Sequence, residues 1–352
     1  FTGFASADDI QYSLNALNGG IWDLSVQFAK DQGRFHFLFS SPAGHFAYIF
    51  HNLLISKLIN ILLIFSNIIL ISVIIRHLLK DKWTAYLVFL FIVVFITGKG
   101  IYNPLVCYPT YFSGSFSLLL LSLFFAIKYA QTYQNRFRYF SAIIYAVTIL
   151  YYESYILYFP IIALILCYFD SKPDNQSFLQ RQWGNIKTCL PHIIVVLLYL
   201  TAYVGFRFAY PSHYGGASIA AHFSILNVTK AVLNFATGAY PLLNALSKSH
   251  TVYGSALYFK DSFSHILYFI FSEHFEWIVK SIVVGFLVSY FMKKSELQLN
   301  RRFLIIFCIS FLYIFIPHIP LALTEKYLEY GGFANYVTTY FAFYAVMICT
   351  AT

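Results

Sequence analysis

The charged residues best suited to chemistry lie near the start of the chain. Asp8 and Asp9 are adjacent, Arg34 follows, and all three precede the first long apolar stretch. Two neighbouring carboxylates hinder each other's ionisation, so one of them could act as a general base toward a hydroxyl group. The planar guanidinium of Arg34 suits phosphate oxygens. This combination predicts chemistry on an anionic, lipid-borne substrate.

The same segment also has a purely structural interpretation. Ser6 fits a helix N-cap with Asp9 three residues later, and Asn18-Gly19-Gly20 fits a helix end. Apolar residues recur between them at helical spacing: Ile10, Leu14 and Leu17. The segment could therefore be an amphipathic helix on the membrane surface, whose aspartates serve only the helix dipole. Arg34 could likewise be a snorkelling anchor.

The composition predicts the elements that must position these residues. The chain is 59% hydrophobic and 11% charged, with a mean hydropathy of +0.67, whereas soluble domains carry roughly a quarter charged residues. Repeated apolar runs separated by short polar loops indicate an all-α, polytopic membrane helix bundle. The net charge of +9 is spread over short clusters between these runs, which argues against nucleic-acid binding. The five cysteines show no CxxC spacing, which argues against a disulfide framework or zinc site.

About nine spans are visible, and several are shorter than the roughly 20 residues needed to cross hydrocarbon, so tilted or broken helices are expected. Their predicted ranges are 51–75, 84–97, 113–130, 139–152, 155–169, 189–209, 274–291, 303–320 and 336–352. We interpret 1–352 as one integral-membrane domain. Its parts are an acidic loop at 1–50, a first group of spans at 51–209, a long loop at 210–273 and a last group at 274–352.

The basic loops predict the orientation. Alternating spans place four basic clusters on one side, which we interpret as cytoplasmic. The clusters are Arg76, Lys80 and Lys82; Lys128, Arg136 and Arg138; Lys172, Arg181 and Lys187; and Lys293, Lys294, Arg301 and Arg302. The opposite, extracytoplasmic side then receives the acidic loop, the Tyr151–Tyr155 turn, the 210–273 segment and a 317–335 loop.

Two of these extracytoplasmic segments contain further candidates. Glu153 follows Tyr152 in a tight turn, and an acid at membrane depth is costly unless it faces a cavity or a partner. Its alternative role is a helix cap or an interhelical hydrogen bond. Lys326, followed by Tyr327, could neutralise a phosphate; the alternative is a solvated ion pair with Glu329. His318 could bind substrate or relay protons, although a lone loop histidine usually does neither.

The order Asp8-Asp9, Trp22 and Gly33-Arg34-Phe35, followed by many spans, resembles the GT-C class of integral-membrane glycosyltransferases, in particular bacterial enzymes of the O-antigen glucosyltransferase type. The Tyr151–Tyr155 stretch resembles the tyrosine–glutamate–serine turn of such proteins, and Leu323–Tyr327 resembles a late lysine–tyrosine motif. The resemblance implies transfer of a sugar from a polyprenyl-phosphate donor to a lipid-linked or cell-envelope glycan, such as lipopolysaccharide, on the outer side of the bacterial inner membrane.

The resemblance also implies roles. Asp8 or Asp9 would be the base that deprotonates the acceptor, and Arg34 and Lys326 would surround the donor phosphate. Substrate-binding roles fall to the remaining candidates: Glu153, Tyr152, Trp22, Tyr327 and His318. Some relatives need a divalent cation (Mg²⁺ or Mn²⁺), but the Asp8-Asp9 pair alone is too sparse a ligand set to predict a metal site.

The chain departs from the family's pattern at its start. Members have a membrane span before the acidic loop, so we expect the sequence to be truncated at its N-terminus. Two other functions stay open from the residues. An O-antigen polymerase or flippase would share the many spans and aromatic loops. A secondary transporter fits less well, because the chain has no internal repeat and its charged candidates gather on one face.

Overall fold

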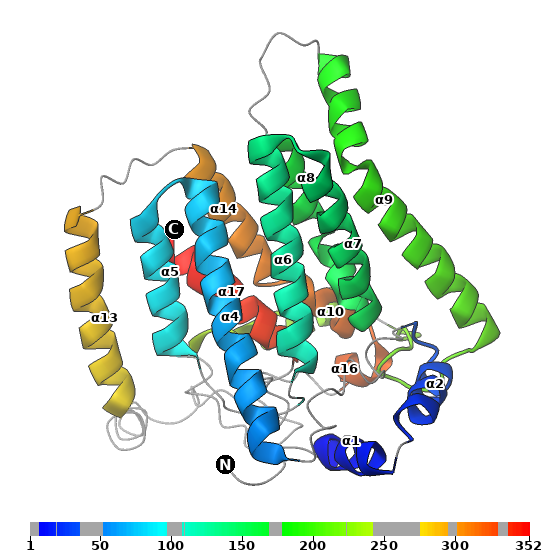
Figure 1. The fold of residues 1–352 in the computed structure, drawn as a ribbon. Helices are drawn as coiled ribbons and strands as arrows, with labels where there is room; N and C mark the ends of the chain where they lie inside the picture. The colour runs from blue at the N-terminus through cyan, green and yellow to red at the C-terminus, as the bar shows by residue number, and fades with distance from the viewer. Residues whose placement is uncertain are drawn as a thin grey trace. The chain divides into compact units, whose positions relative to one another are not determined.

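The computed structural model describes residues 7–18, 20–35, 52–96, 108, 110–168, 178–222, 224–241, 275–294, 301–329 and 337–352. These residues are helical apart from turns, loops and one isolated antiparallel bridge between Ile219 and Thr324. The prediction of an all-α helix bundle is confirmed for them. The chain divides into two compact units, one of residues 1–78 and 107–218 and one of residues 79–106 and 219–352 (Figure 1).

The first unit contains the N-terminal helices and three of the four helices that are long and apolar enough to cross a membrane. Its elements are α1 (Ala7–Leu17), α2 (Ile21–Gln32), α4 (Leu53–Leu79), α6 (Tyr111–Thr132), α7 (Asn135–Tyr151), the 3₁₀-helix η1 (Glu153–Tyr158), α8 (Phe159–Tyr168) and α9 (Phe178–Ala209). The predicted helix after Ser6 is confirmed as α1, which ends before Asn18.

The second unit contains the remaining helices. They are α5 (Lys82–Phe95), α10 (Ile225–Thr237), α13 (Phe275–Lys294), α14 (Arg301–Tyr313), η3 (Ile316–His318), α15 (Ile319–Ala322), α16 (Glu325–Glu329) and α17 (Val337–Ala351). The sequence predicted a plain loop over 317–335. That prediction is wrong for the described part, because three short helices follow one another from Ile316 to Glu329.

Each of the nine predicted apolar segments contains a helix, but the helices differ in their capacity to cross a membrane. Four are long and apolar enough: Leu54–Leu79, Tyr111–Thr132, Gln182–Ala209 and Arg301–Ala322. These four indicate a membrane protein. The others are shorter, and nine spans stay a prediction. The predicted 189–209 segment belongs to a longer helix that begins at Phe178.

Small polar side chains join the helices of the first unit. Asn60 and Asn67 of α4 hydrogen-bond to the start of α6, where Asn60 Oδ1 accepts from Ser113 and Asn67 Nδ2 donates to the Ser113 carbonyl. Deeper in the unit, Ser141 of α7 bonds to Ser122 of α6 and to His192 of α9. Hydrogen bonds of this kind join helices that share an apolar surrounding.

Basic residues of the first unit lie together at one end of its helices. Gln131 at the end of α6 bonds to His77 at the end of α4, and Arg138 near the start of α7 donates to the Lys187 carbonyl in α9. Helices α1 and α2 lie across the opposite end of this unit (Figure 1). At that end Tyr111 donates to the Tyr151 carbonyl at 2.8 Å. This second end therefore carries the tyrosine-rich turn and the N-terminal charged segment.

Candidate functional site

The end of α2 fixes the backbone that carries Arg34. Gly33 has a φ of +58°, its N–H donates to the Lys30 carbonyl, and the N–H of Arg34 donates to the Ala29 carbonyl. These two bonds form a Schellman motif, which stops the helix and turns the chain sharply. A Cβ at position 33 would stand 2.6 Å from the carbonyl oxygen of Tyr210. Glycine is thus required at position 33 for two reasons: the backbone is left-handed, and the Tyr210 carbonyl oxygen lies too close for a Cβ.

Arg34 forms an ion pair with Glu153. The guanidinium donates from Nε and from Nη2 to the same carboxylate oxygen, Oε1, at 2.7 and 2.6 Å. The two side chains are 17% and 26% exposed, so the pair is half-buried. It joins the chain after α2 to the first residue of η1. Glu153 therefore has a charged partner, which compensates for the cost of holding an acid in a largely apolar surrounding.

Aromatic rings surround the pair on the α6–α7 side. The Arg34 guanidinium lies 5.7 Å from the ring centroid of Tyr152, which is buried and packs against Phe112. Burial raises the pKa of the Tyr152 hydroxyl, and the nearby Arg34 charge opposes that rise. Tyr152 therefore stays a neutral phenol at ordinary pH. A neutral phenol can donate or accept a hydrogen bond beside the ion pair.

A second arginine holds this part of the site in place. Arg207, near the end of α9, donates from Nη1 to the carbonyls of Gln32 and Gly33 at 3.5 and 3.3 Å, and from Nη2 to the Ala217 carbonyl at 2.7 Å. One guanidinium thus joins the end of α2 to the loop after α9. Arg207 does not stand out in the sequence, because an arginine at the end of an apolar run looks like a membrane anchor.

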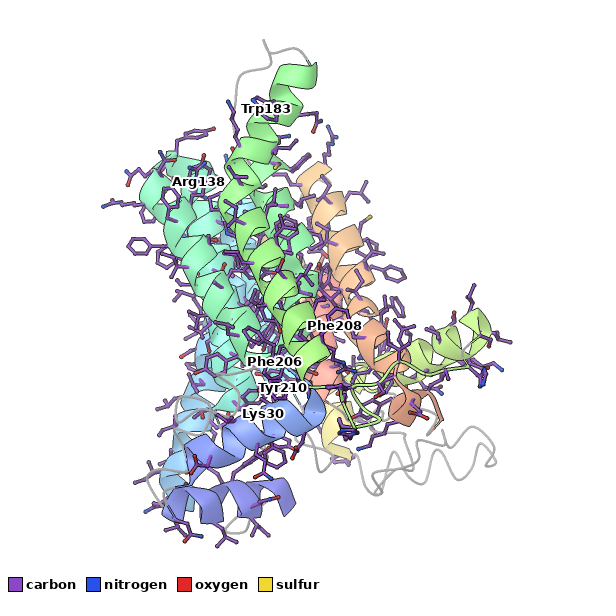
Figure 2. All side chains as sticks on the ribbon, turned by 90° about the vertical axis from the view of Figure 1, so that its right-hand side faces the viewer. Lys30, Arg138, Trp183, Phe206, Phe208 and Tyr210 are labelled. Atoms are coloured by element: carbon purple, nitrogen blue, oxygen red, sulfur yellow. The ribbon has the colours of Figure 1, made fainter. Side chains whose placement is uncertain are left out.

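Helix α9 adds an aromatic wall next to the pair. Tyr199 donates to the Phe35 carbonyl at 3.1 Å, and the Phe35 ring meets those of Tyr199 and Phe206 edge to face. Figure 2 shows Lys30 beside Tyr210 and Phe206 at this end of α9, whereas Trp183 and Arg138 lie toward the other end. Neither Tyr199 nor Phe206 stood out in a sequence with 30 tyrosines and 39 phenylalanines.

Three predicted residues of the first unit cannot be added to this geometry. Asp8 and Asp9 lie in the first turn of α1, and Trp22 lies near the start of α2. Their side chains are outside the described part of the structure, as is the predicted cap Ser6. The helix that carries the aspartates is nevertheless held near α6, because Tyr12 packs against Tyr108 with ring centroids 6.4 Å apart. The roles of Asp8, Asp9 and Trp22 stay predictions.

The other predicted residues form a cluster in the second unit. His318 is buried, its ring stacks on Phe235 at 5.6 Å, and its Nδ1 lies 2.8 Å from the Thr338 hydroxyl. Tyr327 is also buried and packs on Phe235, while the Lys326 ammonium lies 5.5 Å from the Tyr327 ring centroid. His318 was expected in a loop but belongs to a packed 3₁₀-helix. Its burial favours a structural role over direct substrate contact.

Metal ligands are sparse among the described residues. No group of three or more histidine, cysteine, aspartate or glutamate side chains comes together there. The Arg34–Glu153 pair offers one carboxylate, and that carboxylate already carries a guanidinium. What this arrangement can do is bind an anion or a polar ring, through one cation and several hydroxyl groups.

The described residues that can serve a substrate are thus Arg34, Glu153 and Tyr152, with Tyr111 and Tyr199 beside them. Comparison with known proteins adds no assignment: no protein-family model, curated protein or solved structure matches the chain.

Proposed function

We propose that the chain is a membrane glycosyltransferase of the GT-C class. It moves a sugar from a polyprenyl-phosphate donor to a lipid-linked or cell-envelope glycan acceptor, and it works at the outer side of the bacterial inner membrane. The observation that carries the proposal is the Arg34–Glu153 pair at the end of the first unit away from its basic loops. A cation paired with an acid next to the end of α7, beside buried tyrosines, suits a lipid phosphate and the sugar attached to it.

The chemistry asked of this site is a single displacement. Asp8 or Asp9 takes the proton of the acceptor hydroxyl, and the acceptor oxygen then attacks the anomeric carbon. A new bond forms between that carbon and the acceptor oxygen as the bond to the donor phosphate breaks. The leaving phosphate carries the negative charge, which Arg34 stabilises.

Glu153 has a defined part in this proposal. It holds the guanidinium of Arg34 in one orientation before the donor arrives. A guanidinium has five N–H donors, so a phosphate can join the carboxylate on it or replace it. The tyrosines nearby supply hydroxyl groups for the sugar hydroxyls and ring faces for its C–H face. Lys326 stays a second, separately predicted phosphate ligand.

A transfer assay with reconstituted protein tests the proposal. Liposomes receive the purified chain, radiolabelled polyprenyl-phosphate glucose and lipopolysaccharide, and the label on the acceptor is counted. We expect single-sugar transfer by the wild type, and loss of at least one hundredfold in Asp8→Asn or Asp9→Asn, because removal of a general base costs about 10²–10⁴ in rate. Arg34→Gln should lose at least one hundredfold as well, because removal of a group that stabilises developing charge costs about 10²–10³. Repeating the assay with EDTA, and with Mg²⁺ or Mn²⁺ added back, tests the need for a cation.

Matched variants and the product distinguish the rival functions. Asp23→Asn on α2 and Arg136→Gln at the other end of the first unit remove the same charges elsewhere and should keep full activity. Full activity in both Asp8→Asn and Asp9→Asn would refute the proposed base. Growth of a long glycan chain would instead identify a polymerase, and movement of the lipid across the bilayer without transfer would identify a flippase.

A further inference from the structure

Two cysteines that are 22 residues apart in the chain come into contact between α8 and α9. The sulfur of Cys167, near the end of α8, lies 3.4 Å from the sulfur of Cys189 in α9. That distance is close to van der Waals contact, and a disulfide needs the sulfurs at about 2.05 Å. Bond formation requires the two sulfurs to approach each other by about 1.4 Å. Both residues are thiols in the structure.

The two thiols differ in accessibility. Cys189 is 5% exposed, whereas Cys167 is only half-buried, near the end of its helix. Polar groups lie near the two thiols, because Lys187 stands two residues before Cys189 and its carbonyl accepts a hydrogen bond from Arg138. A water-borne reagent can therefore reach Cys167 first.

We propose that Cys167 and Cys189 form a reversible dithiol–disulfide site, which a small-molecule disulfide oxidises. The Cys167 thiolate attacks one sulfur of the reagent, forms a mixed disulfide and releases one thiolate. The Cys189 thiolate then attacks the Cys167 sulfur, so that the Cys167–Cys189 bond forms and the second thiolate leaves. Two electrons pass to the reagent, and the two protons lost by the cysteines end on its two released thiols.

The site lies where a bond would restrain both sides of the ion pair. Helix α8 continues directly from η1, which begins with Glu153, and Arg207 near the end of α9 bonds to the Gly33 carbonyl, next to Arg34. A bond between Cys167 and Cys189 would fix the end of α8 that is farther from Glu153 in the chain to the first half of α9. The oxidation site itself does not depend on the proposed transfer reaction.

Peptide mapping of the whole protein in liposomes tests the proposal. The protein is treated with oxidised glutathione and, in parallel, with diamide, which crosses membranes; remaining thiols are alkylated, and the digest is analysed without reduction. We expect a linked peptide containing Cys167 and Cys189, lighter than its two parts by two hydrogen atoms and separated again by dithiothreitol. Absence of this peptide with both reagents, or linkage of either cysteine to a different one, would overturn the proposal.

Single variants test the order of the two steps. In Cys189→Ser the mixed disulfide of Cys167 with glutathione should accumulate, because the resolving thiol is missing. In Cys167→Ser the buried Cys189 should remain a thiol. Cys308→Ser, which removes an exposed cysteine of α14, should leave the linked peptide unchanged. Equal glutathione labelling of Cys167 in the wild type and in Cys189→Ser would contradict a resolving role for Cys189.

Discussion

Arg34 and Glu153 are 119 residues apart in the chain, yet two nitrogens of the guanidinium meet one carboxylate oxygen at 2.7 and 2.6 Å. The pair joins the segment after α2 to the turn between α7 and η1. It is one of several contacts that connect the N-terminal charged segment to the other helices of the first unit.

Removing either charge of the pair should destabilise the protein. We expect Arg34→Gln and Glu153→Gln each to lower the free energy of unfolding by roughly 1–3 kcal/mol, because a half-buried charge loses its hydrogen-bonded partner. The double variant should cost less than the sum of the two single changes. Unfolding by SDS in mixed micelles measures all three. Strict additivity would show that the pair contributes no coupling.

Gly33→Ala should disturb the turn that carries Arg34. The added Cβ would meet the Tyr210 carbonyl oxygen at 2.6 Å, and a φ of +58° is unfavourable for alanine. A residue forced into the left-handed region costs about 1–3 kcal/mol. Gly20→Ala is the matched control, since its φ is −89° and its Cβ would meet nothing within 4 Å. A thermal melt in detergent that showed equal losses in both variants would contradict this explanation.

Arg207→Lys should loosen the loop after α9 although it keeps the charge. A lysine ammonium cannot span the carbonyls of Gly33 and Ala217, which the two terminal nitrogens of Arg207 reach at 3.3 and 2.7 Å. We expect faster proteolytic cleavage within residues 210–218. Arg136→Lys, at an exposed arginine that donates to nearby Gln134 and lies over the Phe137 ring, should cleave at the wild-type rate. An unchanged rate in Arg207→Lys would show that charge alone suffices.

Ser141→Ala should weaken the packing of α6, α7 and α9. The Ser141 hydroxyl donates to the Ser122 carbonyl at 2.9 Å and lies 2.9 Å from His192 Nε2, all within the buried interior. Interhelical hydrogen bonds of this kind contribute roughly 0.6–1.7 kcal/mol. Ser66→Ala is the control, because that exposed serine bonds only back to its own helix at Leu62. SDS unfolding should separate the two variants.

The sequence predicted the helices well where a local signal exists. Apolar runs identified a helix in each of the nine segments, and Asn18-Gly19-Gly20 correctly indicated the end of α1. The prediction failed where the signal was mixed. The start of α9 at Phe178 was missed because the first residues of this helix are polar enough to look like a loop. The segment Ile316–Glu329 looks irregular in the sequence because Pro317 and Pro320 interrupt it.

The candidate site was predicted in part. Arg34, Glu153 and Tyr152 were chosen singly, each for its own chemistry, and the structure brings them together. Arg207 and Tyr199 were missed, because their partners are backbone carbonyls, which every residue has. The contact between Cys167 and Cys189 was missed for a related reason: no motif marks two cysteines that meet only through the packing of two helices.

The sequence by itself determined that this chain is helical and apolar, and that its charges fall between the apolar runs. Those properties follow from composition and periodicity, which act over a few turns of helix. Only the tertiary structure decided that Arg34 meets Glu153 and that Arg207 holds Gly33. Such contacts depend on how several helices pack and on where each helix ends. The local sequence around one residue does not indicate which distant residue it contacts.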